Sequence, residues 1–142
     1  LNIEQMTDIA KEVDVIIDCS DNFETRYALN KIAFCLKKPL ISGAAIKFDG
    51  QISVFDFREK SSPCYECLFP DTNNEEELRC ADHGVFSPMV GIIGSTQAAE
   101  AIKIILDVGV SLMGRLLLLD SKDMIWKTIK IVKDKGCKVC SI

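Results

Sequence analysis

The sequence predicts an α/β fold in which a β-α-β unit is followed by antiparallel strands and a long helix. Val13–Cys19 is short, rich in β-branched residues and apolar at nearly every position, which is typical of a buried strand in a parallel sheet. A helix-capping pattern follows this run directly. Two later pairs of strand-like segments are each separated by a turn signal. The 142 residues, 48% of them hydrophobic, suffice for one domain with a substantial core.

Cap and turn residues divide the chain into elements. Ser20 or Asp21 is predicted to cap the first helix, and Pro39 to stop it. Asp49-Gly50 indicates a hairpin turn, and Gly109 ends a second, longer helix. The predicted elements are strand Val13–Cys19, helix Phe23–Leu36, strands Leu40–Ala45 and Gln51–Phe57, helix Pro88–Val108, and hairpin strands Gly114–Asp120 and Met124–Val132.

Three expectations concern exposure and packing. Cys19 and Cys35 stand among apolar residues and are expected to be small buried side chains. The polar segment Ser61–His83 is expected to form an exposed, mobile loop. Small residues recur at helical spacing in the long helix, which predicts close packing of that face in the core. They are Gly91, Gly94, Ser95 and Ala98.

Charge and patterning exclude several classes of protein. The formal net charge is −4 and no basic block occurs, so we expect no nucleic-acid partner. No apolar run reaches the ~20 residues of a membrane span, and the polar, acidic opening does not fit a signal peptide. We therefore expect a cytoplasmic protein with no membrane partner.

The pattern matches only part of a nucleotide-binding fold. No G-x-G-x-x-G fingerprint and no Walker loop occurs, and the first residue is Leu1 rather than Met. We therefore interpret residues 1–142 as a single domain that is the second half of a Rossmann-like open sheet with an antiparallel extension. On this interpretation the chain is a fragment that lacks its N-terminal nucleotide-binding half.

Four of the seven cysteines form two identical C-x-x-C motifs, Cys64–Cys67 and Cys137–Cys140. Two residues between thiolates allow both sulfur atoms to reach one tetrahedral ion, so the pair predicts a closed, four-cysteine structural zinc site. A redox dithiol is the alternative.

Cys80 differs from the other cysteines, because it lies in a polar stretch close to Arg79 and His83. It is either a nucleophile or a plain exposed loop cysteine.

Two carboxylates follow the first predicted strand, at the strand end where open α/β sheets bind ligands. Asp18 and Asp21 could hold Mg²⁺ together with phosphate oxygens of a nucleotide, with Arg26 one turn into the helix near a phosphate or a carboxylate. The competing interpretation is that one of the aspartates only caps the helix.

The chain resembles the C-terminal part of the ThiF/MoeB/HesA group of ubiquitin-activating-like adenylyltransferases. The resemblance runs in order over nearly the whole chain and is specific. The motifs that carry it are Ile17–Asn22 with Arg26, Pro39–Ala45, Gly50–Phe55, Pro63–Leu68, Cys80 with Gly84-Val85, Pro88–Gly91, Gln97–Lys103 and Gly136–Cys140.

This resemblance implies an activity for the intact protein. Family members use ATP and Mg²⁺ to adenylate the C-terminal glycine of a ubiquitin-like sulfur carrier, which is ThiS-like in thiamin and MoaD-like in molybdopterin biosynthesis. Relatives are commonly homodimers. Because the family's glycine-rich loop and phosphate-gripping residues belong upstream of Leu1, the 142-residue piece alone is expected to be inactive.

The resemblance also implies residue roles. Asp21 matches the Mg-binding aspartate, and Asn22 its neighbour at the nucleotide; Arg26 has a supporting role. Cys64, Cys67, Cys137 and Cys140 match the zinc ligands, and Cys80 a loop cysteine that links covalently to the carrier in some members.

Two other functions compete with the adenylyltransferase. The chain could be a zinc-stapled module that binds a ubiquitin-like tail without chemistry. It could also be half of a nicotinamide-dependent dehydrogenase, but that would need the missing glycine fingerprint.

Overall fold

A computed structural model describes residues 2–71 and 83–141. The described chain forms one five-stranded sheet with strands in the order β1-β2-β3-β4-β5. The strands are β1 (Ile16–Asp18), β2 (Pro39–Ile46), β3 (Asp49–Asp56), β4 (Arg115–Asp120) and β5 (Ile125–Lys130). Strand β1 pairs with β2 in parallel, and every later pairing is antiparallel. The predicted α/β class and its antiparallel extension are confirmed.

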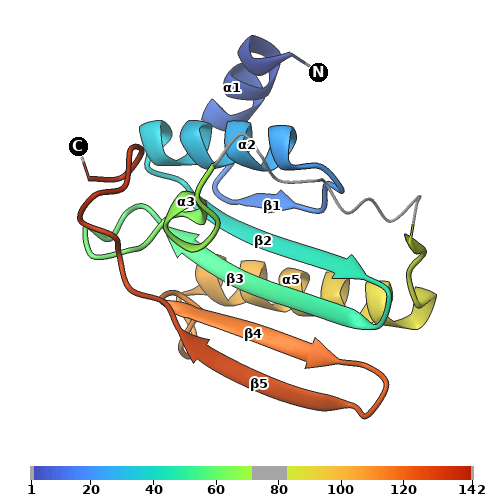
Figure 1. The fold of residues 1–142 in the computed structure, drawn as a ribbon. Helices are drawn as coiled ribbons and strands as arrows, with labels where there is room; N and C mark the ends of the chain where they lie inside the picture. Colours follow the sequence, from blue (N-terminus) through green and yellow to red (C-terminus); the bar gives the residue numbers. More distant parts are fainter. Residues whose placement is uncertain (1, 72–82, 142) are drawn as a thin grey trace.

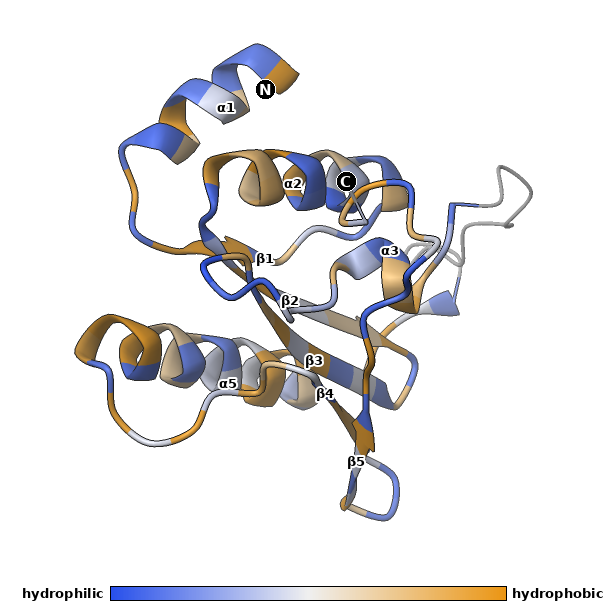
Figure 2. Ribbon diagram, turned by 90° about the vertical axis from the view of Figure 1, so that its left-hand side faces the viewer, coloured by the Kyte–Doolittle hydropathy of each residue, from blue (hydrophilic) through white to orange (hydrophobic). Residues whose placement is uncertain are grey.

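Helices cover both faces of the sheet. The helices are α1 (Ile3–Lys11), α2 (Phe23–Leu36), the short α3 (Tyr65–Leu68) and α5 (Ser87–Leu106). Helices α2 and α3 lie over one face and α5 over the other, with α1 outside α2 (Figures 1 and 2). One core cluster lies under α2 and α3, and a second, around Ile41, Ile52 and Met89, lies under α5.

Helix α1 was not predicted. Its signal is nevertheless present in the sequence as a capping box, in which Asn2 Oδ1 accepts from the backbone N–H of Gln5 at 2.8 Å and Gln5 Oε1 accepts from that of Asn2 at 3.0 Å. The helix buries Ala10 and packs Met6 against the core. Its polar composition is therefore that of an amphipathic surface helix.

Three packing expectations change. Cys19 and Cys35 are exposed rather than buried, because β1 ends before Cys19 and Cys35 lies on the outer side of α2. Gly91 and Gly94 lie on an exposed face of α5, where a methyl group added to either residue would meet no described atom within 4 Å. This face is therefore not packed in the part of the chain that the structure describes. In the predicted exposed loop, Ser62 to Glu66 are buried, because Cys64 and Tyr65 pack into the core cluster between α2 and the sheet. Residues 72–82 of that loop lie outside the described residues.

Helix α5 is the longest helix described, and its length and mean hydropathy of 1.4 would also suit a membrane span. In the structure it buries Met89, Ile93 and Ala101 against β2 and β3. Buried Glu100 anchors the segment that follows: its carboxylate accepts from Lys103 Nζ at 2.6 Å and from the backbone N–H of Leu112 at 2.8 Å. These contacts fix the connection from α5 to β4.

The start of α5 is tied to the β2–β3 turn. Lys47 donates its backbone N–H to Gly84 O at 2.9 Å, and its own carbonyl accepts from the backbone N–H of Phe86 at 2.7 Å. The carboxyl ends of β1 and β2, the β2–β3 turn and the start of α5 therefore gather at one edge of the sheet (Figure 1).

Alanine substitutions at Ile52 and Ile129 test which part of the sheet forms the core. Ile52 is fully buried under α5, whereas Ile129 on the outer strand is 48% exposed. Ile52→Ala should cost about 2–5 kcal/mol of unfolding free energy because it leaves a cavity. Ile129→Ala should cost less than about 1 kcal/mol because it removes little buried area. Urea unfolding measures both, and equal losses would contradict this assignment of the core.

Candidate functional site

A cavity of about 720 Å³ lies at the carboxyl ends of β1 and β2. Loop residues after β1, the second half of β2 and both layers of helices contribute to its wall. The loop and α2 bring the polar side chains of Asp21, Asn22 and Arg26, whereas the β2 end and α5 bring small and apolar ones such as Ala45 and Ile93. Open α/β sheets bind ligands beyond the carboxyl ends of their strands, and ligand sites combine apolar walls with a few polar groups, as this cavity does.

Asp18 shapes the loop rather than facing the ligand. Its side chain is 1% exposed, and Oδ1 accepts from the backbone N–H of Ser20 at 2.9 Å and from Ser20 Oγ at 2.6 Å. Ser42 Oγ lies 3.5 Å from Oδ2. With both carboxylate oxygens used, Asp18 turns the chain sharply after β1 and ties the turn to β2. The expectation that Asp18 shares a cation site is therefore not supported by its geometry.

Asn22, and neither Ser20 nor Asp21, caps α2. Asn22 Oδ1 accepts from the backbone N–H of Thr25 at 2.8 Å, which satisfies one of the free donors in the first helical turn. The predicted cap was therefore wrong by one or two positions. The capping bond uses the amide oxygen of Asn22 and leaves its NH₂ group toward Asp21, at 3.4 Å from Oδ1.

Asp21 is left with a largely free carboxylate. It is exposed, borders the cavity, and receives only the long Asn22 contact from the described residues. It also stands just before the N-terminus of α2, where the helix dipole favours negative charge. An exposed carboxylate that neither caps a helix nor pairs with a cation is free to bind a divalent ion.

Arg26 is buried beside this loop and lines the cavity. Its Nη2 donates to the backbone carbonyl of Ser20 at 2.7 Å, which holds the loop down on α2. Its Nε has no hydrogen-bond partner within the described residues. A buried guanidinium with an unused donor at a cavity wall suits an anionic ligand oxygen.

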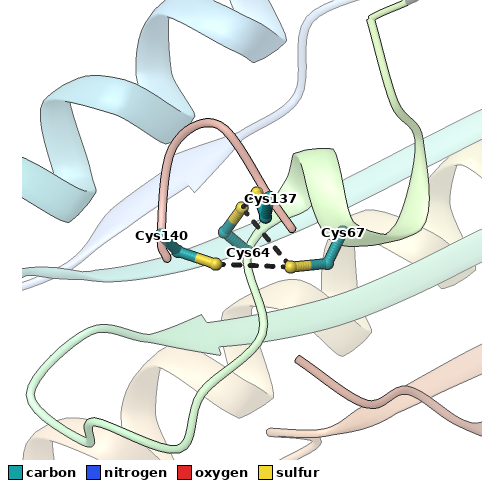
Figure 3. A group of neighbouring side chains, drawn as sticks. All are labelled: Cys64, Cys67, Cys137 and Cys140. Atoms are coloured by element: carbon teal, nitrogen blue, oxygen red, sulfur yellow. Dashed lines mark hydrogen bonds between the residues drawn. The ribbon is translucent and has the colours of Figure 1, made fainter. Parts of the chain in front are cut away.

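The four cysteines of the two C-x-x-C motifs come together at the edge of α3. All four sulfur atoms lie within 4.8 Å of one another and point toward a common centre (Figure 3). Cys64 and Cys137 are 3.5 Å apart, and Cys67 and Cys140 are 3.3 Å apart. A tetrahedral site with metal–sulfur bonds of about 2.3 Å separates its sulfur atoms by about 3.8 Å, so this cluster could hold a metal ion.

Burial dominates the electrostatics of the cluster. It raises the pKa of Cys64 to about 12, and raises the pKa of Cys140 further, with the hydrogen bond to Cys67 adding to the effect. Burial also acts to raise the pKa of Cys137, but backbone hydrogen bonds from Cys140 and Val139 outweigh it and lower that pKa. Buried thiols that resist deprotonation need a nearby cation to become thiolates, which is what a metal ion supplies.

Helix α3 connects the cysteine cluster to the cavity. Tyr65 lies between Cys64 and Cys67 in the chain, is 1% exposed, and donates its backbone N–H to Asn30 Oδ1 on α2 at 2.9 Å. Tyr65 and Phe69, whose rings are 5.0 Å apart, both line the cavity. The cluster therefore fixes the aromatic wall that closes the cavity under α2.

The structure thus brings three predicted site residues, Asp21, Asn22 and Arg26, to one cavity and the four cysteines to a separate cluster. Cys80 lies outside the described residues, and its role stays a prediction. Sequence reasoning assigned no role to Gln97, which also lines the cavity. Its signal was an amide at helical spacing from the apolar residues Met89 and Ile93.

The family match covers residues 1–139, which is nearly the whole chain, and the matching family is ThiF. The chain belongs to the ThiF family. Among its relatives is the adenylyltransferase and sulfurtransferase MOCS3 of Drosophila persimilis, 44% identical over 94% of this chain. The MOCS3 protein of Dictyostelium discoideum is 43% identical over 96% of this chain. The chain spans only about a third of the length of these relatives, 30% and 32% respectively.

Solved structures share the fold. Escherichia coli MccB, in a crystal structure with ATP, superposes with a TM-score of 0.75 at 19% identity, over 100% of this chain and 45% of that protein. The heterocyclase TruD superposes with a TM-score of 0.71 at 13% identity, over 97% of this chain and 25% of that protein. At these identities the likeness concerns the fold.

The assignment of Asn22 as cap and Asp21 as free carboxylate predicts different stabilities for two neighbouring variants. Asn22→Ala should lower the unfolding free energy by about 1 kcal/mol, because the Thr25 N–H loses its acceptor. Asp21→Ala should change it by less than about 0.5 kcal/mol, because an exposed side chain with one long contact is lost. Chemical unfolding distinguishes them. A larger loss for Asp21→Ala than for Asn22→Ala would reverse the assignment.

Proposed function

We propose that the intact protein to which this chain belongs is an adenylyltransferase that activates the C-terminal glycine of a ubiquitin-like sulfur carrier. The proposal rests most on the free Asp21 carboxylate at a strand-end cavity in a ThiF-family chain. The relatives named adenylyltransferase and sulfurtransferase support it. The carrier would be ThiS-like or MoaD-like, and its recovery with the intact protein would decide between thiamin and molybdopterin biosynthesis.

The proposed reaction joins two anions. A carboxylate oxygen of the carrier's terminal glycine attacks the α-phosphorus of ATP, the bond from that phosphorus to the β-phosphate oxygen breaks, and pyrophosphate leaves. The product is an acyl-adenylate, in which AMP has replaced oxide as the leaving group. A bound Mg²⁺ supplies charge neutralisation between the phosphates.

This chain's own residues would orient and neutralise the reactants. Asp21 would hold Mg²⁺, and the NH₂ group of Asn22 and the unused Nε–H of Arg26 would donate to ligand oxygens. The small side chains of Ala44 and Ala45 on β2 would leave room in the cavity for an extended, glycine-rich tail. The remaining phosphate contacts would come from polypeptide outside this chain.

Asp21→Asn in the full-length protein tests the central role. It should reduce carrier-dependent ATP–pyrophosphate exchange by roughly 10²-fold or more, because the Mg²⁺ ligand is lost, while carrier binding is retained. Asp8→Asn, on the exposed face of α1, is the matched control and should leave exchange unchanged. Wild-type exchange that survives Asp21→Asn would contradict the role. Carrier binding by a wild-type protein without exchange would support the non-catalytic module instead.

We further propose that the cysteine cluster holds one structural Zn²⁺. The four thiols and their spacing support a structural rather than a catalytic site, because four thiolates would fill the coordination of a tetrahedral ion.

Four reduced thiolates favour a reducing compartment, which supports a cytoplasmic protein. The family resemblance also supports a homodimer, which light scattering of the intact protein would measure.

Loss of zinc should loosen the segment that carries the aromatic wall. Cys137→Ser should lower zinc content well below one ion per chain and lower the melting temperature, whereas Cys35→Ser, at an exposed position on α2, should change neither. Lowering the pH should release the ion, because protons compete strongly for a thiol such as Cys64 with a pKa raised to about 12. Elemental analysis and thermal melts measure both effects. An unchanged melting temperature after complete chelation would contradict a structural ion.

A further inference from the structure

Gln97 connects the end of β1 to the neighbouring strand β2 from the face of the sheet that α5 covers. It extends from α5 and is 2% exposed. Its Nε2 donates to the backbone carbonyl of Asp18 at 2.8 Å, at the end of β1, and to that of Ile41 at 3.3 Å, in β2. Its Oε1 accepts from Cys19 Sγ at 3.5 Å, in the first residue of the Asp21 loop. One amide thus contacts the end of β1, the adjacent strand β2 and the first residue of the loop.

The partners fix which way the amide points. The NH₂ group faces two carbonyl oxygens, and the amide oxygen faces a thiol that can donate to it. Partial desolvation and the neighbouring Asp18 carboxylate raise the pKa of Cys19, and a protonated thiol can donate to the amide oxygen. Neither a carboxylate nor an apolar side chain of similar length can make these three contacts.

Gly43 supplies the space for the amide. A methyl group on Gly43 would overlap the side-chain amide of Gln97 and would meet its Nε2 at 2.6 Å. Because Gly43 also lines the cavity, the amide and the cavity floor are in direct contact. An alanine here would displace Gln97 without changing its chemistry.

Glu100 shows how a purely structural polar group on the same helix is used. It is similarly buried, at 5% exposure, but it anchors the chain after α5, away from the cavity lining. Gln97 itself lines the cavity instead, and so does its partner Cys19. We propose that Gln97 is a positioning residue, which sets the distance between the Asp21 loop and the Gly43 floor so that Mg-ATP and the carrier carboxylate meet in reactive geometry.

This inference rests on the proposed adenylation, and its test uses the full-length protein. Gln97→Met removes the three contacts at similar side-chain volume, and Gln97→Glu places a carboxylate against two carbonyl oxygens. Both should raise the KM for Mg-ATP and lower kcat/KM in ATP–pyrophosphate exchange by about 10- to 100-fold, the effect of misplacing reacting groups by about 1 Å. Gly43→Ala should reproduce the effect.

Glu100→Gln is the matched control. It should lower the melting temperature without changing the KM for Mg-ATP, because it loosens a loop remote from the cavity. The inference is overturned if Gln97→Met and Gly43→Ala keep the wild-type KM, or if activity in all four variants falls only in proportion to the loss of folded protein. Absence of exchange in the wild-type protein would instead overturn the proposed function, so the two failures are distinguishable.

Discussion

The parallel pairing of β1 with β2 is the constraint on which the candidate site depends. The register Ile16↔Leu40 to Asp18↔Ser42 makes both strands run in the same direction and places the end of β1 beside the middle of β2. Because β1 stops at Asp18 while β2 continues to Ile46, the chain after β1 must turn beside an extended stretch of β2. That turn carries Asp21, and the extended stretch forms the cavity floor. All later strands are antiparallel, so this edge has no second equivalent in the described sheet.

Most polar residues at and after the end of β1 make structural hydrogen bonds, and Asp21 is the exception. The Asp18 carboxylate accepts the hydrogen bonds of the turn, and the Asn22 amide oxygen caps α2. Arg26 uses one of its donors for the carbonyl of Ser20. These bonds hold the loop in place. The carboxylate of Asp21 makes only the long contact with Asn22 among the described residues. The cysteine cluster acts at longer range, since it fixes α3 and hence the aromatic side chains on the far wall of the cavity.

Local patterns in the sequence predicted most of this fold, and tertiary contacts decided the rest. Helix α2 ends before Pro39 as predicted, and paired C-x-x-C spacing located the cluster. The predicted Asp49-Gly50 turn was wrong by two positions, because both residues pair with β2 inside β3 and the chain turns at Lys47-Phe48. The helix cap was misplaced because Asp, Ser and Asn have similar capping preferences, and only the path of the loop selects Asn22. Cys19 and the Gly91 face were expected to be buried because apolar neighbours were taken to share their environment. The task of Gln97 depends on contacts across 56 to 79 positions of sequence, which no local pattern encodes.

The most direct test of the Asp21 assignment is a crystal structure of the full-length protein with ATP, Mg²⁺ and its carrier. We predict an Asp21 carboxylate oxygen about 2.0–2.1 Å from a magnesium ion that also contacts ATP phosphate oxygens, with the carrier's terminal glycine lying along β2 beside Gly43. A magnesium ion held wholly by other residues, with Asp21 facing solvent, would contradict the assignment.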